Sequence, residues 1–147
     1  MSDRYSARIE IGGDLPRQHL LKFGRVFEAS DENALMARVA DGHLILDDDQ
    51  AAWGEFHELE SAGRDLGLPY QRHSEGYWDC PPQLVYWQPG MEGPESVTTS
   101  GDGDMLVSMD TLREARDYMR AGNAARARAL LEETIIEVPE LPAFRLV

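Results

Sequence analysis

The chain has 147 residues, with 14 Lys and Arg against 27 Asp and Glu, so its formal net charge is −13. A chain of this length can bury a core of its own as one domain, and its 42% hydrophobic content excludes an intrinsically disordered protein. The negative charge argues against direct binding to DNA, RNA or anionic lipid, because neutralising phosphate requires a cationic surface.

The first half of the chain predicts an alternation of strands and helices. Residues 5–11 alternate apolar and polar side chains, as a half-buried strand does. Asp14 suits the N-cap of a helix that ends near Ser30. Asp41-Gly42 then lies between two short apolar runs, which predicts a β-hairpin over residues 35–47.

A second helix is predicted directly after Asp47-Asp48-Asp49, because carboxylates favour a helix N-terminus. Apolar residues then recur at helical spacing until Gly67 and Pro69 end the pattern, and residues 69–74 suit another strand. The order β-α-β-β-α-β is that of the ferredoxin-like plan. We therefore predict an α+β fold with a ferredoxin-like core, extended by extra strands.

The second half predicts less regular structure at first. Residues 77–82 form an aromatic, proline-interrupted loop, and residues 83–88 suit a strand. Residues 89–104 are rich in Gly, Pro and acidic residues, which predicts a long surface loop, and residues 105–108 suit a short strand.

Two helices are predicted near the C-terminus, the first capped by Asp110 and ending at Gly122-Asn123. The pair resembles a single helical hairpin of the tetratricopeptide type, on Tyr118, Gly122, Ala127 and Leu131. Repeats of that type need about three copies to bury a core. We therefore expect the hairpin to pack on the sheet, with residues 144–147 as an edge strand.

These predictions divide the chain into three parts. Residues 1–88 are expected to form the α+β core with an acidic middle, residues 89–104 an acidic Gly/Pro-rich loop, and residues 105–147 the helical hairpin packed on that core.

Candidate catalytic residues are few. His57 begins a segment like the zinc-binding helix of metalloproteases, but Ser61 stands where the second His is needed. Cys80 could pair with His73 as a nucleophile, although Pro81-Pro82 places it in an extended segment rather than at a helix N-terminus. We expect no catalytic residue, metal or cofactor; the alternative is a small metal- or thiol-dependent enzyme that uses His57, His73 and Cys80.

The negative charge is concentrated in the middle of the chain. Residues 28–104 carry three basic and seventeen acidic groups, a balance of −14, whereas residues 1–27 carry +2 and residues 105–147 carry −1. Carboxylates held on a rigid surface can imitate phosphates and steer association with a basic groove. The aromatic segment of residues 70–87 offers the side chains that most often anchor interfaces. Adjacent strand residues point to opposite faces, so we expect either Tyr86 or Trp87 to be exposed.

The sequence therefore favours a non-catalytic acidic protein-binding module. The residues expected to bind a partner are Asp47, Asp48, Asp49, Glu55, Glu58, Asp65, Tyr77, Trp78 and Trp87. In size, charge and lack of motifs the chain resembles compact acidic inhibitors of phages and mobile elements, including nucleic-acid mimics and anti-CRISPR proteins. The resemblance implies a basic, nucleic-acid-binding protein as the partner. A structural subunit that forms a homodimer through its aromatic strand remains a further alternative.

Three features bear on the cellular location. No apolar run approaches the roughly 20 residues that span a bilayer. The first ten residues mix acids and bases without the apolar stretch of a signal peptide. A single cysteine suits a reducing compartment, so we expect a cytoplasmic protein without membrane contact.

Overall fold

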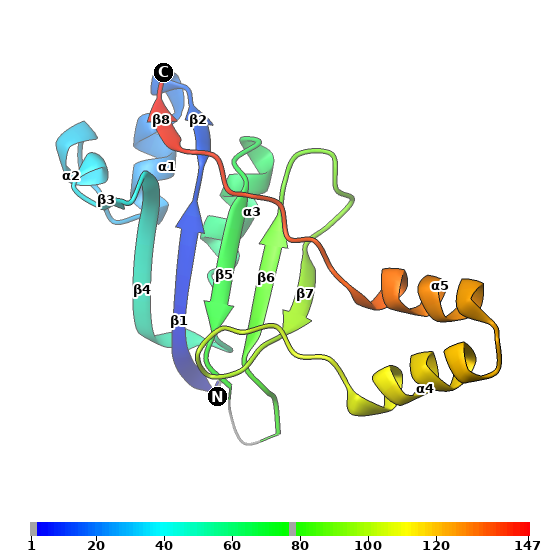
Figure 1. The fold of residues 1–147 in the computed structure, drawn as a ribbon. Helices are drawn as coiled ribbons and strands as arrows, with labels where there is room; N and C mark the ends of the chain where they lie inside the picture. The colour runs from blue at the N-terminus through cyan, green and yellow to red at the C-terminus, as the bar shows by residue number, and fades with distance from the viewer. Residues whose placement is uncertain (1–2, 77–78) are drawn as a thin grey trace.

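Figure 1 shows the computed structural model of the chain, which describes residues 3–76 and 79–147. The predicted α+β class is confirmed by an antiparallel sheet of six strands with helices. In sheet order the strands are β3 (Val39–Ala40), β4 (His43–Ala52), β1 (Arg4–Ile11), β5 (Tyr70–Ser74), β6 (Gln83–Trp87) and β7 (Glu95–Thr98). A separate parallel pair joins β2 (Gly13–Leu15) to β8 (Phe144–Leu146).

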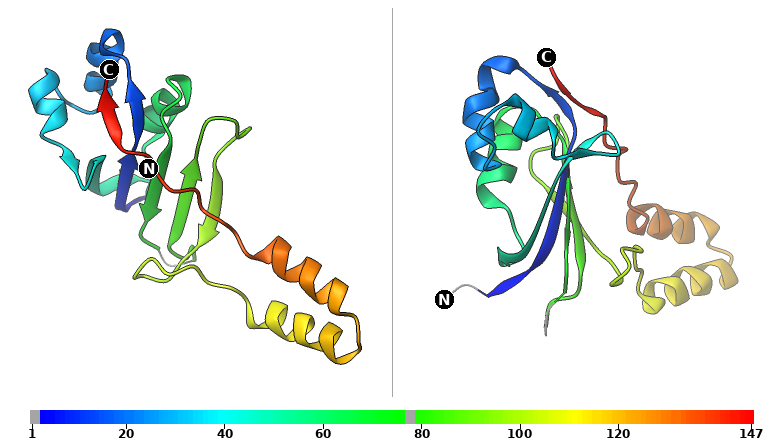
Figure 2. Two further views of the ribbon diagram at one scale, coloured as in Figure 1. Left: turned by 45° about the horizontal axis from the view of Figure 1, so that its top comes forward. Right: turned by 90° about the vertical axis from the view of Figure 1, so that its left-hand side faces the viewer.

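The sheet is covered by helices on one face (Figure 2, right). Along the chain the helices are η1 (Arg17–His19), α1 (Leu20–Val26), α2 (Glu32–Met36), α3 (His57–Asp65), α4 (Met109–Arg120) and α5 (Ala124–Thr134), of which α4 and α5 do not cover this face. The alternation in β1 explains the core. Ile9 and Ile11 are fully buried in one cluster with Phe23 and Phe27, whereas Arg8 is exposed. Successive strand residues point to opposite faces, so the apolar set meets the helices.

Asp47, Asp48 and Asp49 do not cap a helix, and that prediction is wrong. They lie inside β4, which continues to Ala52 because its backbone pairs with β1. Helix α3 begins only at His57. Carboxylates are depleted in strands, so the local pattern favoured a helix start, but strand pairing between distant segments outweighs that preference.

The hairpin at Asp41-Gly42 is confirmed, since both residues have positive φ (52° and 83°) and join β3 to β4. Its first arm is shorter than predicted, because residues 32–36 form α2 instead. Asp31 caps that helix by accepting a hydrogen bond from the Ala34 N–H at 2.8 Å.

Asp14 was expected to cap the first helix, and instead it lies in β2 opposite Arg145 of β8. The Arg145 guanidinium donates to both carboxylate oxygens of Asp14, at 2.8 and 3.0 Å. The predicted C-terminal strand is therefore confirmed, and its partner is a segment 131 residues away.

The expected loop of residues 89–104 contains a strand. β7 pairs with β6 and buries Val97, which adds the sixth strand to the sheet. Residues 105–108, in contrast, form no strand in the described chain. Their β-type pairing there is an isolated bridge between Thr99 and Met105.

Helices α4 and α5 pack against each other and lead away from the sheet (Figures 1 and 2). The expectation was that residues 105–147 would pack on the core. The chain returns through residues 135–143 across the sheet face that lacks α1 and α3, where the Gln71 side chain donates to the Pro139 carbonyl at 3.0 Å. Of the helices in the described residues, none combines the length and apolar character needed to cross a membrane.

Candidate functional site

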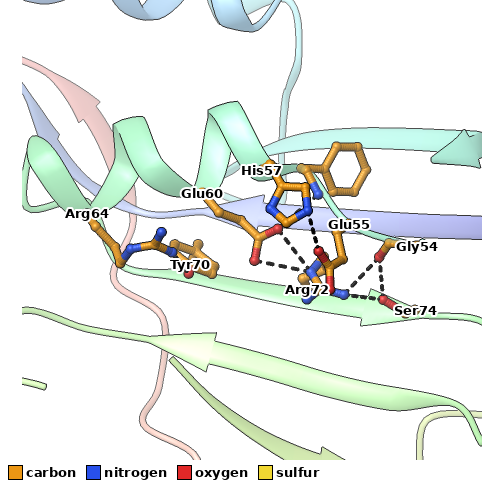
Figure 3. A network of polar contacts seen from close by, with 9 residues as sticks. Gly54, Glu55, His57, Glu60, Arg64, Tyr70, Arg72 and Ser74 are labelled. Carbon is orange, nitrogen blue, oxygen red and sulfur yellow. Dashed lines mark hydrogen bonds and ion pairs between the residues drawn. The ribbon is translucent and has the colours of Figure 1, made fainter. Parts of the chain in front are cut away.

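A buried ion pair joins α3 to β5 (Figure 3). Arg72 Nε lies 3.2 Å from both oxygens of the Glu60 carboxylate, and the two residues are only 4% and 6% exposed. The second Glu60 oxygen accepts the Phe56 backbone N–H at 2.9 Å, where α3 begins. Arg72 also donates to the Gly54 carbonyl and to the Ser74 hydroxyl.

The polar groups of this network form hydrogen bonds with one another. Among the described residues, every buried side-chain nitrogen and oxygen has a hydrogen-bond partner. Arg64 Nη1 donates to the Tyr70 hydroxyl at 2.6 Å, and burial together with the Glu60 carboxylate raises the pKa of Tyr70. The arrangement therefore holds α3 in place and presents no free nucleophile or base.

The three residues of the enzyme alternative lie on separate features. His57 is exposed at the start of α3, with its Nε2 2.7 Å from the Glu55 carboxylate. His73 lies on β5 and lines a hollow on the opposite face with Arg8. Cys80 lines a different hollow, beside Glu55. Over residues 3–76 and 79–147, no three His, Cys, Asp or Glu side chains are arranged to hold a metal ion.

The acidic residues expected to bind a partner lie on β4, on α3 and, in the case of half-buried Glu55, in the turn between them. Asp47, Asp48 and Asp49 are exposed in β4, and Glu58 and Asp65 are exposed on α3. Each aspartate of β4 contacts a neighbouring group of the same chain. Asp47 lies 3.8 Å from the Arg8 guanidinium, Asp48 accepts the Gln50 backbone N–H at 2.8 Å, and Asp49 accepts the Ser6 hydroxyl at 3.2 Å.

The expected exposure of an aromatic side chain on the strand of residues 83–87 is not found. Tyr77 and Trp78 lie outside the described residues. We expected Tyr86 or Trp87 to be exposed, yet they are only 5% and 8% exposed. The reason is that both faces of β6 are covered: Trp87 stacks on Tyr70 with ring centroids 6.2 Å apart, and Tyr86 lies beneath residues 139–141.

The Tyr86 hydroxyl donates to the Glu95 carboxylate at 2.7 Å on the neighbouring strand. Burial, followed by this hydrogen bond and the Glu95 charge, raises the pKa of Tyr86 to about 12. The strand also lies between β5 and β7, so both of its edges are hydrogen-bonded and neither is free to pair with a second copy.

The structure adds a surface that the sequence reasoning missed. Eight of the twelve large apolar side chains exposed in the described chain lie within residues 105–136. They form what we call the helix-pair surface: Met105, Leu106, Val107, Met109, Leu112, Met119, Ile135 and Ile136. The amphipathic pattern of α4 was visible in the sequence, but we assigned its apolar face to the core.

Comparison with protein-family models, with curated proteins and with solved structures returned no match for this chain. We therefore infer its function from the geometry of its surfaces.

Proposed function

We propose that this chain is a non-catalytic protein-binding module whose contact surface is the helix-pair surface. The observation that carries the proposal is the exposure of eight large apolar side chains within residues 105–136: three lie on α4, and five lie in the segments just before α4 and just after α5. This helix pair projects from the sheet (Figure 1). Contiguous apolar patches on a surface mark interaction sites, because leaving them in water costs free energy. The residues with greatest exposure are Met109, Met119 and Ile135, at 59%, 62% and 61%.

The chemistry of the surface favours a protein over a membrane. The chain carries a net charge of −13, which opposes approach to anionic lipid headgroups. Methionine is adaptable in shape and is common at protein-binding surfaces, and three of the eight residues are methionines.

The test is site-specific photo-cross-linking in cells that express the full chain. A photoreactive amino acid at Met119 should capture a protein, whether another copy or a different chain. The same amino acid at Leu21, which is 70% exposed on α1, is the matched control. Capture from Met119 no greater than from Leu21 contradicts the proposal.

A second candidate is the acidic inhibitor expected from the sequence, acting on the basic groove of a nucleic-acid-binding protein. It is supported by Asp47, Asp48 and Asp49, which are adjacent and exposed on β4. Its test is retention of a nucleic-acid-binding protein by the immobilised chain at low salt. The triple variant Asp47→Asn, Asp48→Asn, Asp49→Asn should lose that retention, and equal retention by the variant contradicts this candidate.

Two further proposals concern the fold plan and the cellular location. We assign residues 4–74 to the ferredoxin-like plan, supported by the order β3-β4-β1-β5 and by antiparallel pairing of β1 with both β4 and β5. We assign the chain to the cytoplasm, supported by its single cysteine.

A further inference from the structure

Trp53 lies in the turn that joins β4 to α3, and its indole is open to water. The residue is 47% exposed, whereas Trp87 is only 8% exposed. Its φ is 57° and that of Gly54 is 66°, so two successive residues are left-handed. A bulky residue is an outlier in this conformation, and such outliers cluster at binding sites. The exposed indole is therefore a candidate contact for a ligand.

The turn is held by hydrogen bonds to two other segments of the chain. The Trp53 N–H donates to the Asp3 carbonyl at 2.8 Å. The Gly54 carbonyl accepts hydrogen bonds from the Arg72 guanidinium at 2.8 Å and from the Ser74 hydroxyl at 2.6 Å (Figure 3). The buried ion pair of Arg72 thus fixes the residue next to Trp53. A turn held in this way keeps the indole in place before a ligand arrives, which lowers the entropic cost of binding.

Trp53 lines a hollow of about 340 Å³ together with the carboxylates of Glu55 and Glu75. The other described residues that line it are Ser74, Cys80, Pro81 and Gln83, so it has no lysine or arginine among them. Glu55 already contacts His57, with an Nε2-to-carboxylate distance of 2.7 Å. Glu75 is exposed, and no cation in the described part of the chain pairs with it. The hollow thus combines an aromatic face with a carboxylate that lacks a cationic neighbour there.

We propose that this hollow binds the cationic side chain of a lysine or arginine on an extended segment of a partner protein. An ammonium or guanidinium group is attracted both to the face of a tryptophan ring and to a carboxylate. A metal ion fits less well, because over residues 3–76 and 79–147 no three His, Cys, Asp or Glu side chains are arranged to hold one. The inference goes beyond the proposed function, since none of the described residues lining the hollow belongs to the helix-pair surface.

A larger hollow continues from the first and provides room for the segment that carries this side chain. Its volume is about 680 Å³, and it shares Ser74 and Glu75 with the first hollow. Its described lining has three carboxylates, those of Asp47, Glu75 and Asp102, against a histidine and one arginine, Arg8. The two hollows are therefore acidic together, and a segment with positive charge complements both. A free amine would use only the first.

The experiment is an NMR titration of the ¹⁵N-labelled full chain with a capped tripeptide that has lysine between two glycines. The spectrum of Trp53→Phe identifies the Trp53 indole N–H among the signals of the three tryptophans. That signal should shift and saturate at roughly millimolar peptide, the affinity expected of one exposed ring and one exposed charge. The Trp87 indole N–H donates to the Met91 carbonyl at 3.3 Å and should keep its position.

Two further probes test the chemistry of the ligand. The same tripeptide with its lysine Nζ acetylated carries no charge and should cause no saturable shift, and equal shifts by both peptides overturn the inference. Butylammonium carries the charge without a peptide backbone and should bind at least about twofold more weakly than the lysine tripeptide. Equal or tighter binding of butylammonium assigns the hollow to free amines and overturns the protein segment as its occupant.

Glu75→Gln tests the carboxylate at an exposed position, where the fold tolerates the change. It should weaken binding of the lysine tripeptide about two- to fivefold, as loss of one exposed ion pair does. Glu92→Gln removes an exposed carboxylate from the turn between β6 and β7 and is the matched control, with unchanged affinity. Equal weakening by the two variants would show a general attraction to a negative chain and overturn the inference.

Trp53 is tested by a pair of variants that separate its ring from its backbone position. Trp53→Ala removes the ring and should weaken binding about two- to fivefold. Trp53→Tyr restores an aromatic face at the same left-handed position and should recover part of that loss. Binding by Trp53→Ala that equals the wild type, or a Tyr variant no better than the Ala variant, counts against the indole as the contact.

Discussion

The ion pair of Glu60 and Arg72 shows why one buried charge requires its partner. Both side chains are nearly inaccessible to water, and together with the Phe56 N–H, the Gly54 carbonyl and the Ser74 hydroxyl they satisfy each other's hydrogen-bonding groups. Such a pair adds little stability compared with an apolar pair of the same shape, but loss of one partner leaves an isolated charge in the interior.

We expect Arg72→Met to lower the free energy of unfolding by about 3–5 kcal/mol, because it leaves the Glu60 carboxylate buried without its cation. Urea unfolding measures the change. The double variant Arg72→Met, Glu60→Leu should recover a large part of the loss. As a control, Arg8→Met removes an exposed arginine beside Glu10 and should cost less than about 1 kcal/mol. Equal costs for the two single variants would contradict this account.

Among the elements, the C-terminal strand depends on a close approach of two backbones. β8 pairs with β2, and the chain reaches it past Gly12, where a Cβ atom would lie 1.9 Å from the Pro142 carbonyl oxygen. Glycine is needed at this position because the backbone of residue 142 occupies the space of a side chain. The attachment of β8 is therefore sensitive to one methyl group.

Gly12→Ala should displace residues 142–147 and lower the free energy of unfolding by about 1–3 kcal/mol, as forced overpacking does. Limited proteolysis should cut the C-terminal segment of the variant faster, and urea unfolding should report the lost stability. Gly101→Ala is the matched control, since no atom lies within 4 Å of its Cβ position. Cleavage of both variants at the wild-type rate would show that the approach at Gly12 relaxes without cost.

Considered as a whole, the molecule has a neutral helix pair attached to an acidic body that carries a net charge of −13. This separation gives the two candidate surfaces different responses to salt. Binding of a basic partner by Asp47, Asp48 and Asp49 weakens as salt screens the attraction. Binding through the helix-pair surface depends on apolar contact rather than on attraction between charges, so screening does not weaken it.

We therefore expect retention of a basic partner by the immobilised chain to fall when the salt concentration rises from about 0.1 M to about 1 M, over which the Debye length falls from about 10 Å to about 3 Å. The amount retained at the two salt concentrations measures the change. Equal retention at both concentrations would contradict a contact held by Asp47, Asp48 and Asp49 through charge.

The sequence alone determined the features that depend on neighbouring residues. The alternation of residues 5–11 predicted β1, Asp41-Gly42 predicted the hairpin turn, and Gly122 predicted the end of α4; all are confirmed. These signals are local, because strand alternation, a turn with positive φ and a helix end are set within a few residues.

Only the tertiary structure decided which side chains are covered. It placed Asp47, Asp48 and Asp49 in a strand, buried both Tyr86 and Trp87, and left Met119 exposed on a projecting helix. An amphipathic pattern shows that a face is apolar, but what meets that face is settled by segments distant in the chain. The sequence therefore predicted a protein with a negative charge and an α+β fold, and the packing of its elements showed where it presents an apolar surface.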